Sequence, residues 1–117
     1  MLIAHVTDPH LGLDTSSLPG HPGPAIALRR MLAHVRELAP APDLLLLTGD
    51  LTESGKPHDY EALKGMLREV LPAPSSGGPL ILAVPGNHDA PEVARQTLRE
   101  LMPVAADAPK GRTCIHI

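Results

Sequence analysis

The segment Asp43-Leu-Leu-Leu-Leu-Thr48, followed directly by Gly49-Asp50, decides the fold of this chain. Four successive leucines make both faces of an extended strand apolar, which is typical of a buried central strand in a parallel sheet. Prolines at positions 40 and 42 precede the segment and a glycine ends it, so the apolar run cannot continue as a helix. The remaining elements are therefore expected to pack around this strand.

Other apolar segments alternate between the patterns of strands and helices. Short apolar runs predict three further strands, at Leu2–Val6, Leu80–Val84 and Thr113–Ile117. Apolar residues at helical spacing predict three helices, which begin at Pro24, Pro57 and Pro91. The third helix is expected to include Leu101 and to end at Pro103, while residues 72–79 hold too many prolines and glycines for regular structure.

The predicted order of elements is βαβαβαβ, which indicates a parallel α/β fold. Helical crossovers between successive strands require parallel neighbours and right-handed connections. A chain of 117 residues is long enough for one hydrophobic core. We therefore expect a single domain over residues 1–117.

Composition excludes several classes of protein. Ten Lys and Arg residues against thirteen Asp and Glu give a net charge of −3, which argues against general nucleic-acid binding. No apolar stretch approaches the ~18 residues that cross a bilayer, so no membrane association is expected. The single cysteine, Cys114, excludes an intrachain disulfide and favours a cytoplasmic location.

Polar clusters follow each of the first three predicted strands. They are Asp8-Pro9-His10, Gly49-Asp50-Leu51-Thr52-Glu53 and Gly86-Asn87-His88-Asp89. Because the carboxyl ends of parallel strands meet at one edge of a sheet, we expect the three clusters to converge. Turn formation alone explains the Gly, Pro, Asp and Asn residues, but it does not require a histidine in two of the three clusters.

Converging carboxylate, imidazole and amide groups are the ligands of Zn, Mn, Fe or Co. Asp8 and His10 alternate as the chain leaves the first strand, so both can address one ion. Asp50, on the middle loop, can bridge two ions ~3.5–4 Å apart, and the amide oxygen of Asn87 can serve the second. His88 can then face a substrate.

These motifs, in this order and each after a strand, resemble the calcineurin-like metallophosphoesterase family. The segment from Gly49 to Tyr60 is similar to its branch of class III cyclic-nucleotide phosphodiesterases and glycerophosphodiesterases. The resemblance implies that the chain forms the first, parallel-sheet half of that family's α/β sandwich.

The resemblance also implies a chemistry and a role for each site residue. Asp8, His10 and Asp50 would hold one divalent ion, and Asp50 and Asn87 would hold a second. His88 would act on the phosphate or its leaving group. The implied reaction is hydrolysis of a small phosphodiester, of the cyclic-nucleotide or glycerophosphodiester type, by water activated between two Mn, Fe, Zn or Co ions.

One departure from the family supports a different interpretation. The family completes its site with a lone histidine and a Gly-His-x-His motif, but after His88 this sequence contains only His116. The chain would then be a truncated, catalytically inactive fragment that binds metal weakly or serves as an interaction module. An uncovered sheet edge or face would favour self-association. A third possibility is that another chain supplies the missing ligands.

Three further polar residues have more ordinary interpretations. His5, within the first predicted strand, is expected to be a core histidine or one that supports a ligand. Asp89 is expected to orient a neighbouring histidine, because carboxylates commonly fix imidazole tautomers. Glu53 either supports the site in a similar way or faces solvent.

Overall fold

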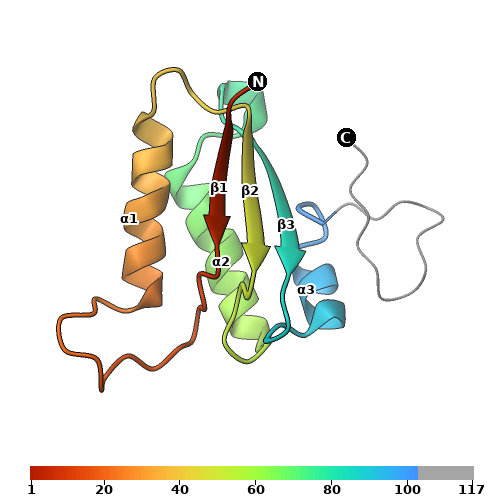
Figure 1. Cartoon of the computed structure of the whole chain (residues 1–117). Coiled ribbons are helices and arrows are strands. Elements are labelled where there is room, and N and C mark those ends of the chain that lie inside the picture. Colours follow the sequence, from red (N-terminus) through yellow and green to blue (C-terminus); the bar gives the residue numbers. More distant parts are fainter. Residues whose placement is uncertain (103–117) are drawn as a thin grey trace.

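A parallel sheet organises the part of the chain that the computed structural model describes, residues 1–102 (Figure 1). Its strands are β1 (Ile3–Thr7), β2 (Leu44–Gly49) and β3 (Leu80–Pro85), arranged in the order β1-β2-β3. Both pairs are parallel, and the arrowheads of all three strands in Figure 1 point to the same end of the sheet. The leucine-rich strand is therefore central, as predicted. The strand expected at 113–117 lies outside the described residues.

The helices begin where the sequence predicts, each with a proline in its first turn. They are α1 (Pro24–Glu37), α2 (Pro57–Val70) and α3 (Pro91–Thr97). Proline suits this position because the first helical N–H groups have no partner within the helix. Among residues 1–102, no helix combines the length and apolar character that crossing a membrane requires.

Two predictions about the connections need correction. The segment 72–79 contains a short 3₁₀ helix, Pro74–Ser76, where no regular structure was expected. Helix α3 ends at Thr97 and does not extend to Leu101. After it ends, the carbonyl oxygen of Leu101 accepts a hydrogen bond from the backbone N–H of Ala83 at 2.8 Å. Leaving the helix thus satisfies a backbone donor of β3.

The hydrophobic core lies between one face of the sheet and the helices. Alternate strand residues point into it, because successive side chains of a strand lie on opposite faces. The large apolar side chains with almost no exposed surface are Leu32, Leu45, Leu47, Leu51, Tyr60, Leu63, Leu98 and Met102. Strands and helices therefore contribute to one core, as expected of an α/β fold.

The opposite face of the sheet is open within the described residues. Ile3 is 44% exposed and Leu80 is 55% exposed, and Leu44 and Leu46 are only partly buried. Burial of β2 on both faces, expected from its leucines, is thus complete only on the helix side. His5 also lies on the open face, exposed, with its Nε2 2.8 Å from Thr48 Oγ1. The expectation that it is a core histidine is wrong, because strand alternation places Ala4 and Val6 on the core side.

Candidate metal centre

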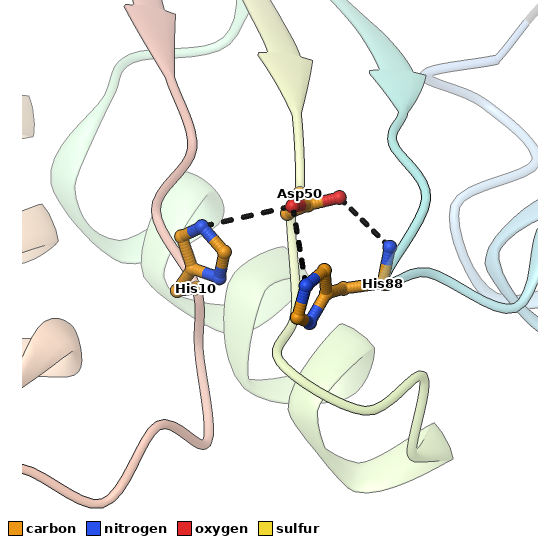
Figure 2. A group of neighbouring side chains, drawn as sticks. All are labelled: His10, Asp50 and His88. Carbon is orange, nitrogen blue, oxygen red and sulfur yellow. Dashed lines mark hydrogen bonds and ion pairs between the residues drawn. The ribbon is translucent and has the colours of Figure 1, made fainter.

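The loops that follow the three strands bring His10, Asp50 and His88 together (Figure 2). One nitrogen or oxygen atom from each residue lies within 4.8 Å of the other two. The three side chains come from three separate loops, so their proximity depends on the parallel sheet. The expected convergence is confirmed for these three residues.

Asp50 lies at the centre of the cluster, at the end of β2. Its carboxylate is buried, and Oδ1 accepts a hydrogen bond of 2.8 Å from the backbone N–H of His88. Its other oxygen, Oδ2, lies 3.7 Å from Nε2 of His10 and 4.0 Å from Nε2 of His88. Gly86 must lack a side chain, since a Cβ there would collide with Asp50 Oδ1.

Asp8 and His10 leave β1 in an unusual backbone conformation. Both have positive φ, 52° for Asp8 and 46° for His10, which few residues other than glycine adopt. The His10 N–H donates to the carbonyl oxygen of Asp50 at 3.0 Å, so the two loops stay paired beyond the strands. The half-exposed Asp8 carboxylate has its Oδ1 3.9 Å from Nε2 of His10. Asp8 therefore borders the cluster.

Glu53 supports the cluster from the side. Its Oε2 lies 2.8 Å from Nδ1 of His10, and its backbone carbonyl oxygen lies 2.9 Å from Nδ1 of His88. The two imidazole rings meet edge to face, 5.4 Å apart. The sequence left open whether Glu53 supports the site or faces solvent, and these contacts decide for support. In the sequence, the only indication of this supporting role was that Glu53 lies three residues after Asp50.

His88 is more open to solvent than the other members of the cluster. Its hydrogen bond to the Glu53 carbonyl raises the pKa of its imidazole, and the negative charges of Asp50, Glu53 and Asp89 add to the effect. Asn87, the residue before it, is exposed on the same loop. The individual roles expected for Asp8, His10, Asp50, Asn87 and His88 stay predictions.

Asp89 does not orient a histidine, contrary to the sequence-based expectation. Its buried carboxylate accepts hydrogen bonds from backbone N–H groups of Leu51, Thr52 and Gly86, and from the hydroxyls of Thr52 and Tyr60. Among residues 1–102, none of the donors to this carboxylate is a histidine ring. Asp89 therefore ties the loops after β2 and β3 to α2.

A cavity of about 350 Å³ adjoins the cluster beside β1 and α1. Its walls are mainly apolar, and Asp8, His10 and His21 provide polar groups. The Nδ1 atom of His21 accepts a hydrogen bond from the Gly23 N–H at 3.0 Å. A neutral His21 therefore carries its proton on Nε2, where it can act as a donor.

The chemistry of the cluster suits a divalent cation. Two imidazole nitrogens and a carboxylate oxygen lie within 4.8 Å of one another, close to the separation of up to ~4.4 Å between two ligand atoms that each lie ~2.0–2.2 Å from one ion. Asp50 and Asp8 supply negative charge, which such an ion would balance. The described residues therefore fit a first-row divalent metal.

Comparison with known proteins gives a consistent result. The sequence profile described as calcineurin-like phosphoesterase matches residues 1–112. A probable cyclic nucleotide phosphodiesterase of Synechococcus is 40% identical over 97 residues, which are 77% of this chain and 32% of the relative. The glycerophosphodiester phosphodiesterase GpdQ of Enterobacter lignolyticus is 30% identical over 111 residues, 95% of this chain and 37% of the relative.

A third relative extends the comparison. The cAMP/cGMP dual specificity phosphodiesterase of Mycobacterium tuberculosis is 29% identical over 114 residues, 97% of this chain and 34% of the relative. The chain therefore spans about a third of the length of these relatives.

Proposed function

The chain belongs to the calcineurin-like phosphoesterase family, and on that premise we propose that it carries the metal-binding core of a phosphodiester hydrolase. The observation that carries the proposal is the meeting of His10, Asp50 and His88 from three strand ends. The named relatives act on cyclic nucleotides or glycerophosphodiesters. The proposed substrate is accordingly a small phosphodiester of one of these two types.

Asp8, His10 and Asp50 are the proposed ligands of one divalent ion. Asp50 and the amide oxygen of Asn87 are the proposed ligands of a second. A bound divalent ion, whether Mn, Fe, Zn or Co, would supply a lowered pKa for water and positive charge for the phosphate oxygens. The buried Asp50 carboxylate suits a shared position because it comes from the middle loop, between the other two.

His88 is the proposed proton donor for the leaving alcohol. Its Nδ1 is occupied by the carbonyl oxygen of Glu53, so Nε2 is the atom that can transfer a proton. Its partial exposure leaves room for a substrate beside the ring. Proton transfer from a positioned histidine typically contributes about 10²–10⁴-fold to a rate.

The cavity beside Asp8 and His10 is the proposed site for the alcohol portion of the substrate. Its mainly apolar walls can cover the carbon skeleton of a leaving group. His21 offers a donor for a hydroxyl or carbonyl on that group. This arrangement favours a diester with a sizeable organic substituent.

Two observations favour a second candidate, a weakly metal-binding or interaction module without turnover. The second ion has only the shared Asp50 and the neutral Asn87 among the described residues, which is poor coordination. The open sheet face also exposes Ile3 and Leu80, an apolar surface that another polypeptide can cover. From this chain alone we expect at most one tightly held ion, little turnover and a tendency to self-associate.

Metal titration and hydrolysis assays on the purified chain separate the two candidates. Calorimetry with Mn²⁺ or Zn²⁺ is run on the wild type, on Asp50→Asn and on the control Glu61→Gln, an exposed carboxylate of α2. We expect about one ion per chain for the wild type and the control, and none for Asp50→Asn. Turnover of a chromogenic phosphodiester by the metal-loaded chain would favour the hydrolase, and metal binding without turnover would favour the module.

A further inference from the structure

Glu53 is held beside both histidines of the cluster by its backbone. Its N–H donates to the carbonyl oxygen of Leu11 at 2.9 Å, which fixes the loop after β2 against the loop after β1. Its carboxylate then reaches His10, with Oε2 2.8 Å from Nδ1. The other carboxylate oxygen, Oε1, lies 3.5 Å from Nδ1 of His88.

The contact with Glu53 determines which nitrogen of His10 carries the proton. An ionised carboxylate can only accept hydrogen bonds, so Nδ1 of His10 must be the donor. In the neutral ring the lone pair is then on Nε2. That atom faces Asp50 Oδ2 at 3.7 Å and Asp8 Oδ1 at 3.9 Å.

Without the Glu53 carboxylate, Asp8 and Asp50 would favour the opposite tautomer of His10, with the proton on Nε2. Two carboxylates near Nε2 attract a proton to that nitrogen, which would block it as a ligand. Both distances exceed the range of a hydrogen bond, so Nε2 donates to neither oxygen in this structure. The short contact at Nδ1 is therefore the interaction that favours the metal-binding tautomer.

We propose that Glu53 is a positioning residue that holds His10 in the tautomer and orientation needed for a metal ion. The proposal rests on the proposed function for its purpose, but the tautomer itself is a property of the metal-free chain. His88 differs from His10 because its Nδ1 partner at 2.9 Å is the backbone carbonyl of Glu53. A change of the Glu53 side chain leaves that carbonyl in place, so His88 provides an internal reference.

The test compares Glu53→Ala, which removes the acceptor, with Glu53→Gln, which keeps an acceptor oxygen and removes the charge. Long-range ¹H–¹⁵N NMR on the metal-free chain at pH ~8.5 reports the tautomer of each neutral imidazole. Zn²⁺ affinity is measured in parallel by competition with a chromogenic chelator. Glu61→Ala, an exposed position of α2, is the matched control.

We expect Glu53→Ala to shift His10 away from the Nδ1–H tautomer and to weaken Zn²⁺ binding about 10- to 100-fold. Glu53→Gln should retain the tautomer and most of the affinity, and the His88 signals should keep their tautomer in both variants. An unchanged His10 tautomer in Glu53→Ala would overturn the proposal. Equal affinity losses in Ala and Gln, with the tautomer kept, would overturn it in favour of Glu53 as a direct ligand.

The NMR result does not depend on metal binding. A wild-type chain that fails to bind Zn²⁺ would contradict the proposed function, while the tautomer of His10 would still decide the role of Glu53. A general loss of folding in Glu53→Ala would appear as loss of dispersion throughout the spectrum. Glu53→Leu, which removes the acceptor but keeps a side chain of similar bulk, then supplies the deciding comparison, and an unchanged His10 tautomer in that variant would overturn the proposal.

Discussion

Asp50 and Asp89 are two aspartates on neighbouring loops that are buried to the same extent, 7% and 8% exposed. Five hydrogen-bond donors surround the carboxylate of Asp89, including two side-chain hydroxyls. Asp50 accepts one hydrogen bond from the His88 N–H among the described residues, and its Oδ2 faces two imidazoles. The two side chains are therefore equally buried, but more hydrogen-bond donors contact Asp89 than Asp50.

This difference separates a structural carboxylate, Asp89, from the proposed metal ligand, Asp50. A buried charge is costly unless hydrogen bonds or a cation compensate for it. The protein itself compensates Asp89, because five donors are available for the roughly four lone-pair positions of its carboxylate. Asp50 keeps an oxygen for a cation. The number of protein donors around each carboxylate therefore predicts which substitution unfolds the chain and which one only removes metal.

The largest effect on stability is expected for Asp89→Asn. An asparagine keeps the shape but presents an NH₂ group to donors, so several buried N–H and O–H groups lose their acceptor. We expect the free energy of unfolding of the metal-free chain to fall by about 3 kcal/mol or more in urea denaturation. The surface control Glu61→Gln should change it by less than ~0.5 kcal/mol. A loss below ~1 kcal/mol for Asp89→Asn would remove the basis of the comparison.

Asp50→Asn should show the opposite behaviour. The amide keeps an oxygen for the His88 N–H but removes the charge that a cation needs, so Mn²⁺ or Zn²⁺ affinity should fall at least ~100-fold. The unfolding free energy of the metal-free chain should change by less than ~1 kcal/mol, because among residues 1–102 no other hydrogen-bond donor uses the Asp50 carboxylate as its acceptor. Calorimetry and urea denaturation of the same samples measure both quantities. Severe destabilisation without metal would mean that Asp50 is also structural.

The substitution His88→Ala tests whether His88 is a proton donor or a metal ligand. As a proton donor, it should be needed for turnover but not for metal content, with turnover about 100-fold lower in an active form of the protein. Metal content per chain is measured by elemental analysis. Loss of the ion in this variant would make His88 a ligand, together with His10 and Asp50.

The smallest effect is expected for Tyr60→Phe, which removes one of the donors to Asp89. The phenol hydroxyl donates to Asp89 at 2.8 Å and accepts from the Ala90 N–H at 2.9 Å. Loss of both bonds should cost about 1–2 kcal/mol at neutral pH. An unchanged stability would show that the remaining donors are sufficient for Asp89.

Alkaline pH provides a second measurement on Tyr60. Burial raises the pKa of its phenol above the usual value of 10.0, and the negative Asp89 adds to this. A raised pKa means that the folded chain holds the proton more tightly than the unfolded chain. The stability contribution of Tyr60 should therefore be complete below pH ~10 and should decline as pH rises through the raised value. The difference in unfolding free energy between the wild type and Tyr60→Phe should narrow over that range.

Local sequence patterns determined the elements and their order. The leucine run of β2 indicates a central strand because both faces must be apolar, and Pro24 and Pro57 mark helix starts because their missing N–H costs nothing there. The convergence of the three polar loops follows from parallel strands alone. These properties depend on residues close in sequence and on general rules of chain topology, so they can be predicted without coordinates.

Only the tertiary structure decided what each polar side chain contacts. Glu53 meets His10 across 43 positions in sequence, and Asp89 meets Leu51 across 38. Such pairs depend on how the loops bend, including the positive φ values of Asp8 and His10, which the residue types do not specify. A loop backbone is determined by hydrogen bonds to neighbouring loops, so the direction of its side chains becomes fixed only when the whole sheet edge has assembled.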